Sequence, residues 1–401
     1  MSAAPSSRVA ILSAVRTPIG RFGGALRELS AAQLGAHATR AAIEQAGLTP
    51  DRIDEVLFGE VIQAGAGQNP ARQVLRGAGV PDSVGAVTVN MVCGSGMKAL
   101  HLGYLSIRAG ERDRVVVGGM ESMSNAPYLV EGSVRWGTRP GPRTLFDAMQ
   151  YDGLIDAYED HEIMGLTGER IAKKFGLSRT ENDAFALRSN LRASRASADG
   201  TFASEIVPVP GTLTPGGVGL ERDEAPRGDT TMDKLSRLKP AFAAEGVLTA
   251  GNSSKLSDGA AALVLASEAE VERSGVRPIA WVHSIAESGV HPRDVMESPI
   301  PTVRRHLEKT GLSPRDFDRV EHNEAYASAS LAVQKSFGFT EEQFNVYGGA
   351  VALGHPLGAS GARIIVTLLN ALKRGHGHRG LATLCMGGGN GLSTIVERAP
   401  D

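Results

Sequence analysis

Residues 90–100 read Asn90-Met91-Val92-Cys93-Gly94-Ser95-Gly96-Met97-Lys98-Ala99-Leu100 and place one cysteine between a strand and a helix. The preceding Val87-Thr88-Val89 is β-branched, whereas apolar residues from Met97 to Ile107 recur at helical intervals. Gly94 and Gly96, which follow the cysteine, predict a tight backbone turn. A thiol at a helix start faces unpaired amide N–H groups, which lower its pKa. We therefore expect Cys93 to be an activated nucleophile.

A buried structural cysteine is the simpler interpretation of Cys93, because free cysteine is among the residue types most often buried. A catalytic thiol needs a base and hydrogen-bond donors from other parts of the chain. Whether the remaining sequence supplies them decides between the two interpretations.

Composition restricts the class of protein. With 401 residues the chain exceeds the size at which one hydrophobic core stops growing, so we expect two domains or two packed halves. A net charge of −2 argues against binding to nucleic acid or to an acidic membrane surface. The two cysteines, Cys93 and Cys385, are too few for a disulfide-built secreted domain. The opening residues show no signal pattern and no long apolar segment follows, so we expect a cytoplasmic protein without membrane insertion.

Strand and helix patterns alternate along most of the chain. Residues 9–15 form an apolar run typical of a strand, and Ser30 is placed to cap a helix that ends before Gly47. This alternation predicts an α/β fold with a mainly parallel sheet covered by helices on both faces. Between about Ser122 and Leu248 the alternation lapses, which indicates a loop domain inserted into the core.

The second half repeats motifs of the first in the same order. Residues 47–56 resemble residues 311–320, and Ser95-Gly96-Met97-Lys98 resembles Ser360-Gly361-Ala362-Arg363. Both four-residue segments open an apolar helix that leads to a glycine-bearing strand. Two similar halves packed together would bring Cys93 and segments of the second half to a shared cleft.

Three segments of the second half are candidates to join Cys93. They are His322-Asn323-Glu324 after a strand, the glycine-punctuated loop that carries His355, and Cys385-Met386-Gly387-Gly388-Gly389. Alone, each segment has a structural explanation: a core histidine, a tight turn, or a glutamate that caps or orients. Together they offer a base, a second thiol and open backbone N–H donors, which suits acyl transfer through a thioester. No metal-ligand spacing is present.

At these motifs the chain resembles the thiolase family of acetyl-CoA acetyltransferases and 3-ketoacyl-CoA thiolases, nearly from end to end. Residues 249–261, Thr-Ala-Gly-Asn-Ser-Ser-Lys-Leu-Ser-Asp-Gly-Ala-Ala, add a further match. The resemblance implies a duplicated, five-layered α-β-α-β-α core with an inserted loop domain. We expect an N-terminal half at residues 1–121, a loop domain with CoA and oligomer contacts at 122–248, a return to the first half at 249–275 and a C-terminal half at 276–401.

The resemblance also implies a ping-pong reaction that makes or cleaves a 3-ketoacyl-CoA, with acetyl-CoA and CoA as the other substrates. Cys93, activated by His355, would carry the acyl group, and Cys385 would be the general acid and base. His355 and a water held by Asn323 would stabilise an enolate oxygen, and the backbone N–H groups of Cys93 and Gly387 a tetrahedral oxyanion. CoA is then a substrate and product, and no permanently bound cofactor is expected.

Substrate-binding positions follow from the same resemblance. Ser254 matches a serine that contacts the pantetheine arm, Arg227 an arginine near the adenine end, and Met164 a loop residue over the acyl pocket. Ala325 and Tyr326 complete the set. Two departures leave the acyl-chain length open, because Ile163 stands where the biosynthetic type carries histidine and Tyr326 where phenylalanine is commoner. Acetoacetyl-CoA or short-to-medium chains are the first expectation, and long-chain β-oxidation is the alternative.

Other classes fit less well. A ketoacyl synthase would lack Cys385, and a dehydrogenase would need G-x-G-x-x-G spacing, which the run from Gly387 to Gly391 does not have. A non-catalytic CoA- or lipid-binding protein could keep the fold without the chemistry. The resemblance further implies a homotetramer or homodimer.

Overall fold

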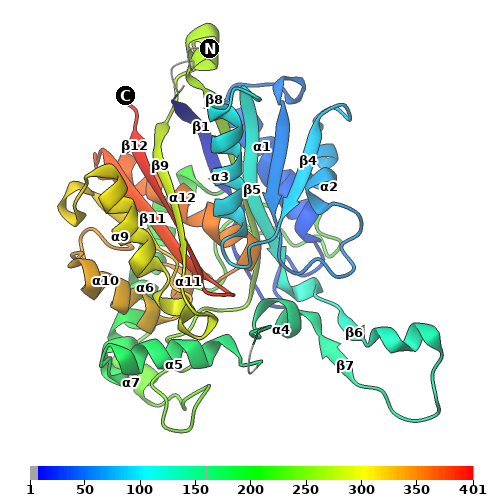
Figure 1. The fold of residues 1–401 in the computed structure, drawn as a ribbon, viewed down its shortest axis with the longest axis vertical. Coiled ribbons are helices and arrows are strands. Elements are labelled where there is room, and N and C mark those ends of the chain that lie inside the picture. Colours follow the sequence, from blue (N-terminus) through cyan, green and yellow to red (C-terminus); the bar gives the residue numbers. More distant parts are fainter. Residues whose placement is uncertain (1–7, 159–160, 401) are drawn as a thin grey trace.

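The computed structural model describes residues 8–158 and 161–400. Figure 1 shows two packed halves, the first mainly in blue and cyan with a yellow-green return at β8, the second in yellow to red. The first half comprises β1 (Val9–Arg16), β2 (Gly20–Arg21), α1 (Ala31–Gln45), β3 (Glu55–Gly59), α2 (Pro70–Gly77), β4 (Gly85–Val89), α3 (Ser95–Arg108), β5 (Arg114–Ser122), β8 (Ser257–Ser267) and α8 (Glu268–Ser274). The second half comprises β9 (Ala280–Gly289), α9 (Pro299–Thr310), β10 (Arg319–His322), α10 (Ala327–Phe337), α11 (Ala350–Leu353), α12 (Leu357–Arg374), β11 (Arg379–Met386) and β12 (Asn390–Arg398).

The strands form one mixed sheet in the order β10-β11-β12-β9-β1-β8-β5-β3-β4, with β2 paired to β8. Only the pairs β3–β4, β3–β5 and β10–β11 are parallel among the described residues, so the prediction of a mainly parallel sheet is wrong. The register gives the reason. Ser122 at the end of β5 pairs with Asp258 at the start of β8. Because the chain leaves and re-enters the sheet at the same end, β8 has to run back antiparallel to β5.

Helices α3 and α12 lie between the two halves of the sheet. A Cβ added to Gly96 would lie 2.8 Å from the Gly358 carbonyl oxygen, and one added to Gly361 would lie 2.5 Å from the Met97 nitrogen. The two helices therefore approach at their backbones, which only glycine permits. Their apolar side chains form one core with inward-facing residues of both halves, including Leu263 and Leu384.

Two further apolar cores lie on the outer faces of the sheet. One packs α1 and α2 against the first half, and the other packs α9 and α10 against the second. With the central helix pair these make five layers, α-β-α-β-α, which confirms the expected fold class. The predicted cap of α1 is also confirmed, since Ser30 and Gln33 form a reciprocal capping box.

The segment between β5 and β8 covers one end of the core. It carries β6 (Tyr128–Val130), β7 (Leu145–Asp147), α4 (Ala148–Gly153), α5 (Met164–Lys174), α6 (Arg179–Ala198) and α7 (Met232–Ser236). Strands β6 and β7 pair as an arm that extends from the body of the molecule, as Figure 1 shows. Across the part of the chain that the structure describes, no helix is long and apolar enough to cross a membrane.

Candidate active site

Cys93 lies between β4 and α3, directly before the N-cap residue Gly94. The residue that turns the backbone is Val92, which has a φ of 47°. A β-branched residue in this left-handed region costs about 1–3 kcal/mol, and such strain clusters at functional sites. The predicted role of Gly94 in the turn is wrong, since its φ is −84°. Its lack of a side chain instead makes room for Met386, whose sulfur would lie 2.4 Å from an added Cβ.

The Cys93 thiol is not activated by its helix position alone. Burial raises its pKa to about 12, and the charge of Glu121 adds to this rise. The backbone N–H groups of Gly387 and of Cys93 itself act in the opposite sense, because both donate toward the sulfur. Burial thus opposes the lowered pKa that the helix position predicts, and deprotonation of Cys93 calls for a base.

His355, in the loop between α11 and α12, has the properties of that base. Its Nδ1 lies 2.6 Å from the Ser360 hydroxyl, which itself donates to the Pro356 carbonyl oxygen at 2.8 Å. A hydroxyl that donates to Pro356 accepts from His355, which favours the tautomer with the imidazole proton on Nδ1 and a lone pair on Nε2. Burial, with the nearby charge of Arg363, lowers the pKa of His355 to about 3, so the ring is neutral.

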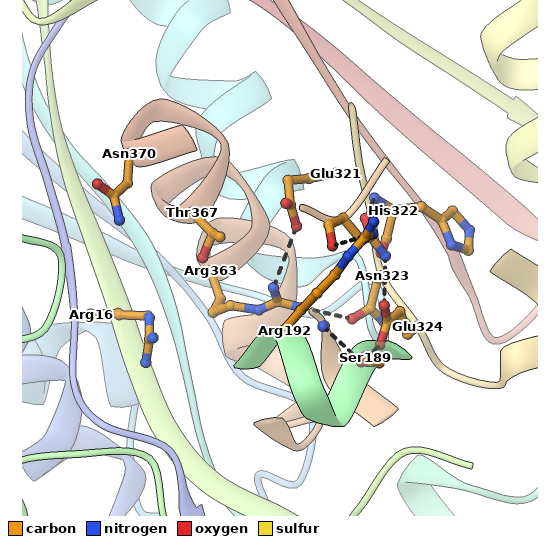
Figure 2. Close-up of polar contacts among 12 residues, drawn as sticks. Arg16, Ser189, Arg192, Glu321, His322, Asn323, Glu324, Arg363, Thr367 and Asn370 are labelled. Atoms are coloured by element: carbon orange, nitrogen blue, oxygen red, sulfur yellow. Dashed lines mark hydrogen bonds and ion pairs between the residues drawn. The ribbon is translucent and has the colours of Figure 1, made fainter. Parts of the chain in front are cut away.

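Asn323 follows β10 and is fully buried. Its amide nitrogen lies 3.4 Å from His355 Nε2, and its amide oxygen lies 3.4 Å from a guanidinium nitrogen of Arg363. Figure 2 shows Arg363 reaching Asn323 from α12. The structure thus brings the predicted asparagine and histidine together.

Cys385 lies at the end of β11, two residues before Gly387, and is 2% exposed. Its sulfur lies 3.6 Å from that of Met296. Burial raises the pKa of the Cys385 thiol, and the charge of Cys93 contributes, so the two sulfurs lie within electrostatic range of each other. Both cysteines are free.

A cleft of about 610 Å³ opens beside these groups. It reaches Val92, next to Cys93, and Gly387, whose N–H points at the Cys93 sulfur. Met164, the first residue of α5, lines the same cleft, as do Asn90, Ile155 and Tyr158.

The remaining predicted substrate residues lie on two adjoining segments. The Ser254 N–H donates to the Ala325 carbonyl oxygen at 3.0 Å, and Ser253 forms a β-bridge with Tyr326. The Tyr326 ring meets Phe242 edge to face at 5.7 Å between centroids. Burial raises the pKa of Tyr326, and the charges of both cysteines add to the rise, which places its hydroxyl near the two thiols.

Arg227 is placed less directly. Its backbone N–H donates to Asn190 at 3.2 Å. Its charge contributes to lowering the pKa of Lys255, after burial as the main cause, so Arg227 lies near the residue that follows Ser254.

Sequence reasoning missed three supporting side chains: Ser360 beside His355, Arg363 beside Asn323 and Met296 beside Cys385. One signal could have identified the first two. Ser360, Arg363, Thr367 and Asn370 recur at helical spacing on the otherwise apolar α12, and all four are buried. A polar stripe on a buried helix indicates an internal polar network. No comparable pattern marks Met296.

Two buried glutamates frame the site. Glu121 accepts N–H groups from Ile62 at 3.1 Å and from Gly358 at 2.8 Å, which ties the cleft wall to the start of α12. Glu324 accepts from Ser189 at 2.7 Å and from Asn345 at 2.8 Å. These bonds confirm that Glu324 orients its surroundings.

This arrangement can perform nucleophilic acyl transfer. It combines a protonated thiol, a neutral imidazole with a free lone pair, a second buried thiol and backbone N–H donors at the first sulfur. Two sulfur atoms in one site can divide the work between attack and proton exchange.

Comparison with known proteins agrees with this chemistry. Residues 9–269 match the family model of the thiolase N-terminal domain, and residues 276–398 match that of the thiolase C-terminal domain. The chain belongs to the thiolase family, and it is an acyltransferase.

Individual relatives are similar over nearly their whole length. An acetyl-CoA acetyltransferase of Pseudomonas aeruginosa is 47% identical, with 97% of this chain and 99% of the relative covered. A probable acetyl-CoA acyltransferase of Staphylococcus aureus is 44% identical, with 98% and 99% covered. Among solved structures, a thiolase of Ascaris suum in complex with coenzyme A superposes with a TM-score of 0.92 at 42% identity, covering 98% of this chain and 100% of the other. The Bacillus anthracis acetyl-CoA acetyltransferase superposes with a TM-score of 0.95 at 39% identity, covering 98% and 99%.

Proposed function

We propose that this chain makes and cleaves 3-ketoacyl-CoA through an acyl-enzyme on Cys93. The observation that carries the proposal is the turn after β11, which sets Cys385 within electrostatic range of Cys93 and directs the Gly387 N–H at the Cys93 sulfur. A nucleophilic thiol needs such a donor for the oxyanion that forms next to it. A second thiol beside it can exchange the α-proton of acetyl-CoA, which formation of a carbon–carbon bond requires.

In the first step the Cys93 thiol gives its proton to His355 Nε2, and the sulfur attacks the thioester carbonyl of an acyl-CoA. The tetrahedral oxyanion accepts from the N–H groups of Cys93 and Gly387. When it collapses, CoA leaves and takes the proton from His355. Two transfers with a covalent intermediate replace one difficult step.

In the second step Cys385 gives its thiol proton to His355 Nε2 and, as thiolate, removes a proton from the α-carbon of acetyl-CoA. The enolate oxygen accepts hydrogen bonds from the newly protonated His355 and from a water held by Asn323. The carbanion attacks the acyl-enzyme, and the Cys93 sulfur leaves and takes the proton back from His355. The reverse sequence is thiolysis of the 3-ketoacyl-CoA by free CoA.

The names of the relatives support acetoacetyl-CoA or a short-to-medium 3-ketoacyl-CoA as substrate, with long-chain thiolysis as the alternative. We propose that Ser254 and Arg227 contact CoA, and that Met164, Ala325 and Tyr326 shape the acyl end of the site. This is consistent with CoA in the Ascaris suum thiolase. The division at residues 121, 248 and 275 and the cytoplasmic location stay predictions.

The experiment is the thiolysis rate of acetoacetyl-, 3-ketooctanoyl- and 3-ketohexadecanoyl-CoA with free CoA, with Cys93→Ala as control. Preference for the first two substrates is expected, and Cys93→Ala should be inactive. Faster turnover of the longest substrate would assign the chain to long-chain thiolysis. No activity on any of the three would contradict the proposed function.

We also propose that the chain forms a homotetramer or homodimer. The β6–β7 arm supports this, because it projects from the body and exposes large apolar side chains at Tyr128, Val130, Trp136 and Leu145. Trp136 is 87% exposed. Light scattering should give the mass of two or four chains, and Trp136→Ser with Leu145→Ser should shift it toward smaller assemblies. A single-chain mass for the unchanged protein at micromolar concentration would contradict this.

A further inference from the structure

The buried side chain of Arg363 is not used in the reaction steps above. It lies on α12, is 1% exposed, and faces β10 across the core, as Figure 2 shows. Among the described residues its guanidinium makes one hydrogen bond, from Nη2 to the Asn323 amide oxygen at 3.4 Å. Its Nε and Nη1 have no hydrogen-bond partner. The direction of that single bond indicates what the arginine does.

An ion pair does not account for this arginine. Arg363 Nη1 lies 3.8 Å from a Glu321 carboxylate oxygen, and neither oxygen of Glu321 accepts a hydrogen bond. Burial raises the pKa of Glu321 well above its usual range, and Arg363 opposes that rise. A buried charge with so loose a counter-ion is costly to the fold, which makes a role in the site the better explanation.

The hydrogen bond fixes the orientation of an otherwise ambiguous amide. Arginine can only donate, so the oxygen of Asn323 must face Arg363 and the nitrogen must face His355. An N–H group facing His355 Nε2 requires a lone pair there. The contact with Ser360 favours the imidazole proton on Nδ1, which leaves the same lone pair. Two separate contacts therefore select one tautomer.

We propose that Arg363 is a positioning residue that acts through Asn323, holding the amide with its N–H groups toward His355 and the reacting oxygen. This inference rests on the proposed function. With the amide reversed, its oxygen would face the Nε2 lone pair, and the enolate oxygen would lose a donor. The charge of Arg363 also polarises the amide, which strengthens its N–H groups as donors.

The test is a mutant cycle with two readouts. Arg363→Met combined with Glu321→Gln removes the guanidinium without leaving a lone buried carboxylate. We expect this pair of substitutions to lower kcat for thiolysis of acetoacetyl-CoA by about 10- to 100-fold, as misplaced catalytic groups do, with little change in KM. In an Asn323→Ala background the same pair of substitutions should lower kcat by less than about threefold, because the residue through which Arg363 acts is gone. A full multiplicative loss in that background would overturn the proposal.

Two further variants separate positioning from folding. Arg363→Lys keeps the charge and most of the apolar stem, but its ammonium ends short of the Nη2 position, so a similar loss of kcat is expected. Unchanged kcat in this variant would overturn the proposal. Thr367→Val is the matched control on the same helix face, since it removes a hydrogen bond to Glu205 at 3.1 Å and does not contact Asn323. It should lower Tm and leave kcat unchanged.

The second readout does not depend on turnover. The ¹⁵N spectrum of His355 reports which ring nitrogen carries the proton. We expect the Nδ1–H form in the parent protein and a larger share of the Nε2–H form after Arg363→Met with Glu321→Gln, because, of the two contacts, the one with Ser360 is then left to favour Nδ1–H. An unchanged tautomer in those variants contradicts the role of Arg363 even if the parent is active. An inactive parent with the expected spectra contradicts the proposed function and leaves the positioning role intact.

Discussion

Ser360 and His355 form a buried pair in which the serine hydroxyl lies 2.6 Å from the imidazole Nδ1 and donates its own proton to Pro356. The pair holds the imidazole with its lone pair on Nε2, the nitrogen that faces Asn323. The first turn of α12 thus favours one protonation state of the proposed base for Cys93.

Ser360→Ala is expected to lower kcat for thiolysis by about 10- to 100-fold, a part of what a positioned acid–base group supplies. The variant leaves the Nδ1 proton without its buried acceptor, so the tautomer is no longer fixed. Ser330→Ala is the matched control, because Ser330 contacts Nδ1 of the buried His322 at 2.9 Å, outside the reacting groups. Steady-state kinetics of both variants make the comparison, and equal losses would show that only general stability had changed.

Cys385→Ala is expected to separate the two half-reactions. Cys93 and His355 stay in place, so acetyl-CoA should still acylate the protein. Condensation and thiolysis should fall at least 100-fold, since no group remains to exchange the α-proton. Stopped-flow release of the first CoA, compared with the steady-state rate, tests this. A variant that lost acylation and turnover equally would contradict the division of work between the two thiols.

The buried pair Glu60 and Glu121 predicts how stability depends on pH. Burial, with Glu121 as charged neighbour, raises the pKa of Glu60 from 4.5 to about 8, and burial raises that of Glu121 to about 7. At pH values between 4.5 and these raised pKa values, the two carboxyls hold protons in the folded chain that they have released in the unfolded chain. The free energy of unfolding should therefore decrease as pH rises through this window.

Glu60→Gln should make the free energy of unfolding less dependent on pH. We expect the change in this free energy across the window to be about 1–3 kcal/mol smaller in the variant than in the parent. Urea unfolding at both ends measures it. Glu111→Gln, at an exposed glutamate, is the control and should leave the slope unchanged. A slope that Glu60→Gln does not alter would mean that this carboxyl is not protonated in the folded chain.

Gly165→Ala is expected to disturb the acyl end of the cleft. An added Cβ would lie 2.1 Å from the ring of Phe242, which packs against Tyr326. The ring must shift, so we expect a loss of about 1–3 kcal/mol in stability and a rise of about tenfold in KM for 3-ketoacyl-CoA. Gly85→Ala, where no heavy atom lies within 4 Å of the added Cβ, should change neither. An unchanged KM for Gly165→Ala would show that the position of Phe242 does not affect binding of the acyl group.

The sequence predicted most of the fold because its patterns are local and repeated. The switch from β-branched residues to helical spacing at Cys93 located β4 and α3, and the repeated segments near residues 47 and 311 indicated two halves. Strand direction could not be predicted this way. The pairing of Ser122 with Asp258 depends on where a long loop segment returns, which no local pattern encodes.

The sequence named the residues of the proposed site but not their electrostatics. Cys93, Asn323, His355 and Cys385 stand in motifs, whereas the raised pKa of Cys93 depends on packing by distant segments. The left-handed backbone conformation of Val92 was not predicted either, because glycine is the residue type expected in a tight turn and two glycines follow nearby. Arg363 stands in a repeated segment of the sequence, which does not reveal its contact with Asn323. That contact arises from the packing of α12 against β10.

The most direct test of the central claim is the mass of the intact protein and of its Cys93 peptide after mixing with acetyl-CoA and rapid quenching in acid. One acetyl group per chain is expected, on Cys93, and it should disappear when free CoA is added before the quench. Cys93→Ala should show none. An acetyl group on another residue, or none in the unchanged protein, would contradict the acyl-enzyme.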